Sequence, residues 1–149
     1  MKILKAMYFL TLALALMVYA CNPPAKKESK SSKAANKVLR YSSITGLKSE
    51  KMAYYKKLHA AAWHGVLKKI TECNIHNYSI YLKEIEGKLY LFSYFEYTGT
   101  DFAADMKKMA ADTTTQRWWK ETAPIQIPLP DAAAKGETWS PMEEVFHHD

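Results

Sequence analysis

The chain has 149 residues, of which 48% are hydrophobic, 13% aromatic and 24% charged. This composition is typical of a globular protein, and 5 Gly and 6 Pro are too few for collagen or for a fully disordered chain. The formal net charge of +6 does not indicate nucleic-acid binding, because from Val38 onward the chain has 14 basic and 14 acidic residues.

The first 20 residues have the pattern of an export signal. Lys2 and Lys5 precede an apolar segment, residues 6–20. This segment is shorter than the about 20 residues that a membrane span needs. The ending Val18-Tyr19-Ala20-Cys21 resembles a bacterial lipobox. We therefore expect residues 1–20 to be a lipoprotein signal peptide and Cys21 to be lipidated, with a plain secretory signal as the alternative.

The residues after Cys21 predict a tether followed by one domain. Residues 21–37 are polar and basic, without a large apolar side chain, so we expect them to be disordered. Residues 38–149 are then a single domain. Together with the leader, this predicts an exported protein, anchored in the bacterial cell envelope by its lipid and facing the periplasm.

Cysteine usage agrees with that organisation. Cys21 and Cys73 are the two cysteines of the chain. If Cys21 carries a lipid, Cys73 has no partner, and an unpaired cysteine of this kind is most often a buried apolar residue. No CxxC or CxxH spacing indicates a metal site.

The first half of the domain predicts a strand, a helix and a hairpin. Val38–Ile44 is β-prone and ends before Gly46. Apolar residues then recur at three- and four-residue steps from Glu50 to Thr71, which predicts one long helix, with Gly65 as a bend or a loose turn in it. The runs 77–82 and 89–97 are rich in aromatic and β-branched residues and flank a turn at Gly87, so we expect a β-hairpin.

The second half predicts a helix, a long loop and a last strand. Asp101 precedes a helix that ends at Ala111, and a short helical turn follows over 114–119. Three prolines between 124 and 130 indicate an irregular loop, and 145–147 is the expected last strand. The order β-α-β-β-α-β predicts an α+β, ferredoxin-like fold with an antiparallel sheet and two helices on one face. The other face is apolar, so we expect a homodimer.

Two groups of residues could carry chemistry. Tyr55, His59 and Trp63 are spaced at i, i+4 and i+8, which places them on one face of the expected helix. A hydrogen-bonded histidine beside core aromatics is the plain structural explanation. Trp118 and Trp119 are adjacent, so their side chains diverge, and we expect one to pack in the core. The other is either simply exposed or at an interface, or it offers an indole face to a sugar or a cation.

Four motifs in order resemble the L-rhamnose mutarotase family. They are Tyr55-x-x-x-His59-x-x-x-Trp63, the run from His76 to Leu82, Thr115-Gln116-Arg117-Trp118-Trp119-Lys120, and Met142-Glu143-Glu144-Val145-Phe146. The resemblance spans about Leu39 to Asp149. It implies a dimeric α+β barrel that interconverts the α and β anomers of L-rhamnose.

The resemblance also implies the roles of individual residues. His59 corresponds to the proton donor of the family, Tyr55 and Tyr78 to its sugar-binding tyrosines, and Trp118 and Trp119 to its sugar-binding tryptophan pair. No cofactor or metal is implied, and the second proton-transfer group stays open between a water, a tyrosine and a carboxylate. The alternatives are a non-catalytic carbohydrate-binding lipoprotein and a ferredoxin-like domain of monooxygenase or structural type.

Overall fold

The computed structural model describes residues 37–148. The predicted signal peptide, Cys21 and all but the last residue of the predicted tether lie outside this range. The elements in chain order are β1 (Leu39–Leu47), the 3-10 helix η1 (Ser49–Lys51), α1 (Met52–Ala60), α2 (His64–Glu72), β2 (Ile75–Ile85), β3 (Lys88–Tyr97), α3 (Phe102–Ala110), α4 (Thr113–Thr122), the 3-10 helix η2 (Ala123–Ile125), β4 (Gln126–Ile127), α5 (Pro130–Ala133) and β5 (Ser140–Met142).

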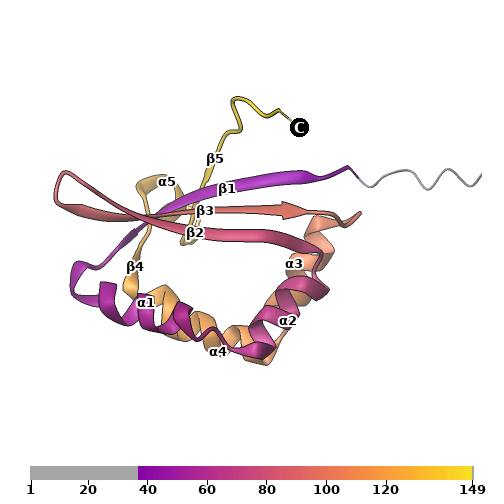
Figure 1. Ribbon diagram of the computed structural model, residues 1–149, viewed down its shortest axis with the longest axis horizontal. Coiled ribbons are helices and arrows are strands. Elements are labelled where there is room, and N and C mark those ends of the chain that lie inside the picture. The colour runs from indigo at the N-terminus through magenta and orange to yellow at the C-terminus, as the bar shows by residue number, and fades with distance from the viewer. Residues whose placement is uncertain (1–36, 149) are drawn as a thin grey trace, which may run out of the picture. The chain divides into compact units, whose positions relative to one another are not determined.

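The sheet is antiparallel and has the strand order β2-β3-β1-β4, with β5 also paired to β1. Helices α1 to α4 lie on one face of the curled sheet (Figure 1). This confirms the predicted α+β, ferredoxin-like topology. None of the helices formed by residues 37–148 is long and apolar enough to cross a membrane.

Two buried clusters join the sheet to the helices. One contains Leu47, Leu91 and Tyr55, and the other contains Cys73, Ile75 and Tyr97. Cys73 is fully buried and has no disulfide partner, as predicted. The strand residues of both clusters point toward the helices. The opposite face of the sheet belongs to neither cluster, and Tyr81 on that face is 64% exposed.

The hairpin and the third helix form where the sequence predicts them. Glu86 and Gly87 have φ of 50° and 72°, which is the left-handed pair that a two-residue hairpin turn requires. Asp101 caps α3 because its carboxylate accepts a hydrogen bond from the Ala104 amide at 2.9 Å.

The predicted long helix is instead two helices. The chain leaves the helical conformation at Ala61 (φ −131°, ψ 50°), and α2 begins at His64. The break lies before Gly65, which sits in the first turn of α2 against the Thr114 side chain. The prediction that Trp63 shares one helix face with Tyr55 and His59 is therefore wrong.

Two further predictions differ from the structure. The last strand is β5, at Ser140–Met142, and residues 145–147 have no regular structure. The expected loop between 124 and 130 contains the short strand β4, which pairs with the end of β1. Gly46 does not end β1, which continues to Leu47. The glycine leaves room for β4, because a Cβ at this position would lie 2.9 Å from the Ile127 carbonyl oxygen.

Candidate functional site

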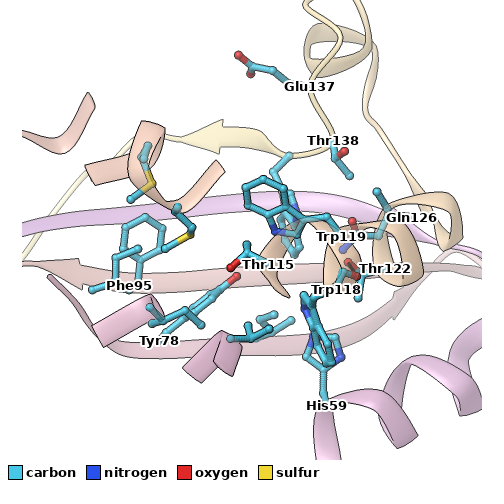
Figure 2. A pocket seen from close by; sticks show the side chains of 18 of the residues that line it. His59, Tyr78, Phe95, Thr115, Trp118, Trp119, Thr122, Gln126, Glu137 and Thr138 are labelled. Atoms are coloured by element: carbon cyan, nitrogen blue, oxygen red, sulfur yellow. Dashed lines mark hydrogen bonds between the residues drawn. The ribbon is translucent and has the colours of Figure 1, made fainter. Parts of the chain in front are cut away.

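A cavity of about 740 Å³ lies between the sheet and the helices, and its size is typical of a small-molecule site. Its polar and aromatic lining comes from α1, β2, β3, α3, α4, β4 and the segment before β5. Figure 2 shows ten of these residues labelled: His59, Tyr78, Phe95, Thr115, Trp118, Trp119, Thr122, Gln126, Glu137 and Thr138.

Helix α1 presents Tyr55 and His59 to this cavity, one turn apart. Their rings stack with centroids 4.0 Å apart. His59 Nδ1 lies 3.0 Å from the backbone carbonyl oxygen of Tyr55. A carbonyl can only accept, so Nδ1 carries a proton and donates, and Nε2 is the nitrogen left for a ligand.

The surroundings of these two side chains set their protonation. Burial lowers the pKa of His59 below its usual 6.5, and the hydrogen bond to the Tyr55 carbonyl opposes this only in part. Burial raises the pKa of Tyr55, and the nearby Tyr78 hydroxyl raises it further. At neutral pH the site therefore holds a neutral imidazole with a free lone pair beside a protonated phenol.

Helix α4 places the tryptophan pair. Its first turn is fixed by Asp112, whose carboxylate accepts from the Thr115 amide at 2.8 Å and from the Thr115 hydroxyl at 2.9 Å. Trp118 is 7% exposed and contacts the His59 ring edge-on at 5.2 Å, whereas Trp119 is 41% exposed. One indole packs and the other is open, as predicted, and both line the cavity.

Tyr78 and Trp63 have different places. Tyr78 lines the cavity from β2, next to a register shift of the β2–β3 ladder between His76 and Ser79. Trp63 is not among the lining residues but packs edge-on against Trp118 at 5.4 Å, with the Arg117 guanidinium 5.4 Å from its ring. The structure thus places five of the predicted site residues around one cavity: Tyr55, His59, Tyr78, Trp118 and Trp119. Trp63 lies outside the cavity and packs against Trp118.

Sequence reasoning missed the lining from β4 and the segment before β5. Gln126 and Glu137 line the cavity, but both lie in a stretch whose irregular pattern gives no indication of where a side chain points. Within residues 37–148, no three His, Cys, Asp or Glu side chains lie together as a metal site would require.

A family model described as L-rhamnose mutarotase matches residues 40–148. The chain belongs to the L-rhamnose mutarotase family. A relative named L-rhamnose mutarotase from Bacillus subtilis is 34% identical over 110 residues, which cover 74% of this chain and 98% of the relative. Another with the same name, from Phocaeicola vulgatus, is 32% identical over 95 residues, which cover 64% of this chain and 84% of the relative.

A solved structure supports the fold. The crystal structure of an L-rhamnose mutarotase from Formosa agariphila matches with a TM-score of 0.55 at 22% identity. The match covers 74% of this chain and 99% of that one. The likeness to it is one of fold, and it confirms the α+β assignment made from the order of the elements.

The comparisons correct the predicted location. The family model begins at residue 40, and the Bacillus subtilis relative aligns over 98% of its own length with 110 residues of this chain. The Bacillus subtilis relative therefore has no counterpart of the leader and the tether. The prediction of an exported, lipid-anchored protein facing the periplasm is wrong.

Proposed function

We propose that the protein is a sugar isomerase that interconverts the α and β anomers of L-rhamnose or a closely related deoxysugar. The observation that supports this most strongly is the neutral His59 in the cavity, with Nδ1 bound to a carbonyl and Nε2 free. A site that only binds sugar has no need of an ionisable group in this state. Mutarotation needs one, because a proton must leave the anomeric hydroxyl as another reaches the ring oxygen.

His59 serves as the proton carrier in this mechanism. Its free Nε2 accepts the proton of the anomeric hydroxyl while the ring oxygen is protonated and the C1–O5 bond breaks. The open-chain aldehyde turns about C1–C2, and the C5 hydroxyl attacks its other face and returns its proton to the group that had protonated the ring oxygen. The imidazolium then returns its proton to the oxygen at C1, which is the donor role that the family resemblance implies for His59.

A tyrosine is the best candidate for the second proton-transfer group. Tyr55 stacks on His59, and burial keeps its phenol protonated, so its hydroxyl can donate to the ring oxygen. Among the described lining residues, Glu137 is the only carboxylate, and it lies across the cavity from His59 (Figure 2). Of the three choices that the sequence leaves open, the carboxylate is therefore the least favoured.

The aromatic residues hold the sugar. Trp119 offers an exposed indole face for the apolar face of a deoxysugar, and Tyr78 adds a hydroxyl from β2. Trp118 closes the cavity behind His59. Substrate binding by Tyr55, Tyr78, Trp118 and Trp119 and proton transfer by His59 are all parts of this proposal.

We also propose that two copies pair through the open face of the sheet. Ile44 lies opposite Phe92, and Tyr81 pairs with Phe92 from β2, which builds an apolar surface on the side away from the helices. Val145 and Phe146, beyond β5, are 91% and 82% exposed. Apolar surfaces of this kind are rarely left open on monomers, and a second copy is the simplest cover.

Saturation-transfer NMR tests the proposed activity. Irradiating one anomeric proton of L-rhamnose should reduce the signal of the other when the protein is present and not in buffer alone. Titration of the same sample with protein separates the alternatives. Broadened sugar signals without transfer would instead indicate a non-catalytic carbohydrate-binding protein and would contradict the proposal.

A further inference from the structure

Gln126 differs in its hydrogen bonding from the other buried polar side chains within residues 37–148. The other five have hydroxyl groups that are engaged by a partner within the fold: Thr45 with the Ile127 carbonyl, Ser93 with Ser43, Thr115 with Asp112, Thr122 with the Trp118 carbonyl and Ser140 with Asp131. Gln126 is 8% exposed, and its side-chain amide lies near the Tyr55 hydroxyl, whose pKa it lowers.

The Tyr55 hydroxyl can engage only a part of this amide. A primary amide has two N–H donors and a carbonyl acceptor with two lone pairs. The amide near the phenol oxygen lowers the pKa of Tyr55, against the effect of burial, as an N–H directed at that oxygen does. The other N–H and the amide carbonyl then remain available for a ligand, and the Tyr55 O–H for the ring oxygen.

The unused groups lie in the sugar cavity. Gln126 and Tyr55 both line it, and the pairing of Leu47 with Gln126 anchors β4 to β1 at this position. Leu47 in turn packs in the same buried cluster as Tyr55. Gln126 is thus a rigidly placed amide, more than nine-tenths buried, whose free hydrogen-bonding groups face a ligand cavity rather than the fold.

We propose that Gln126 determines sugar specificity: its remaining amide N–H and its carbonyl hydrogen-bond a pair of neighbouring hydroxyl groups on the sugar ring. The inference rests on the proposed function of this cavity and names a further ligand of its substrate. A donor and an acceptor on one planar amide match a vicinal diol, in which one hydroxyl donates and the next accepts. Sugars that lack either hydroxyl, or hold it in the opposite orientation, leave the amide unpaired.

Replacing Gln126 with Met tests this, because Met is close in size but has no amide. The matched control is Thr122→Val, which alters a buried polar residue of the same cavity whose hydroxyl is already bound to the Trp118 carbonyl. Binding of L-rhamnose and of its 2-, 3- and 4-deoxy analogues is measured by calorimetry for each protein. Gln126→Glu, which keeps the acceptor and removes the donors, serves as the second variant if Gln126→Met fails to fold.

Gln126→Met should weaken L-rhamnose binding by about 5- to 150-fold, as expected for a lost hydrogen bond to a buried group. The loss should be smaller for the two deoxy analogues that each lack one hydroxyl of the bound pair and undiminished for the third, and Thr122→Val should show no such selectivity. An equal loss for every sugar, or no loss, would overturn the inference while leaving the mutarotase activity in place. Absence of anomer exchange by the wild-type protein would overturn the proposed function and this inference with it.

Discussion

At the scale of single residues, the site depends on how two neighbours share one turn of helix. The Tyr55 carbonyl fixes the tautomer of His59, and the Tyr55 ring covers one face of the imidazole. The same burial that lowers the pKa of His59 raises that of Tyr55, so a base and an acid stand side by side. Pairs of groups whose pKa values move apart are typical of acid–base catalysis.

The lowered pKa of His59 predicts how activity depends on pH. Neutral imidazole starts the cycle, so the protein-catalysed exchange rate should be constant near neutral pH and fall as the pH drops through a midpoint below 6.5. Saturation-transfer NMR between pH 4.5 and 8 measures it after subtraction of the buffer rate. A rate that rises as the pH falls through this range would show that the imidazolium starts the cycle instead.

The two tryptophans should respond differently to removal. Trp119→Ala removes an exposed indole, so it should weaken sugar binding by about 1–3 kcal/mol, on the scale of stacking against an aromatic side chain, and leave stability nearly unchanged. Trp118→Ala empties a buried site beside His59 and should lower the free energy of unfolding by about 3–5 kcal/mol. Chemical denaturation and calorimetry compare the pair, and equal unfolding energies would contradict the division of roles.

At the scale of elements, the features that the sequence predicts correctly are those fixed by residues close together in the chain. The cap at Asp101 and the turn at Glu86-Gly87 depend on neighbours a few residues away, and both are predicted correctly. The strand β4 depends on its pairing with β1, and the break at Ala61 interrupts an apolar periodicity that continues to Thr71, so neither follows from the sequence pattern. Gln126 could not be found for the same reason, since a two-residue strand fixes its side chain only by pairing with Leu47.

The contact between β1 and β4 predicts the effect of a methyl group at Gly46. In Gly46→Ala the new Cβ would meet the Ile127 carbonyl oxygen, which is backbone, so β4 must move. We expect a loss of about 1–3 kcal/mol in stability, together with weaker sugar binding because Gln126 moves with β4. Gly136→Asn is the control, because Gly136 has φ of 69° with open space around it, which Asn tolerates. If Gly46→Ala binds the sugar as tightly as the wild-type protein, the position of β4 does not affect the site, and the prediction is contradicted.

At the scale of the whole molecule, the two faces of the sheet have different tasks. The inner face and the helices enclose the cavity, and the outer face presents Phe92, Tyr81 and Ile44 to solvent in a single copy. The outer face could be inferred from the sequence because the alternation of the hairpin strands leaves apolar residues on both sides. The shape of the cavity could not be inferred from the sequence, because it depends on the break between α1 and α2 and on how these helices pack.

The outer face predicts a dimer that one charge should disrupt. Wild-type protein should have twice the monomer mass in light scattering at micromolar concentration, and Tyr81→Glu should be monomeric, because an unpaired charge would be buried in the interface. Leu67→Glu is the control, since Leu67 is 50% exposed but lies on α2, in the helical layer. A dimer that survives Tyr81→Glu, or a monomeric wild-type protein, would contradict pairing through this face.

The central claim is that His59 carries the proton in anomer exchange, and His59→Ala tests it most directly. Saturation-transfer NMR on L-rhamnose should show the exchange rate above buffer reduced by about 10²–10⁴-fold. Binding of the sugar, measured by calorimetry on the same samples, should change little, and His76→Ala, on an exposed position of β2, should exchange at the wild-type rate. Full exchange by His59→Ala would show that His59 is a structural residue and would contradict the proposed mechanism.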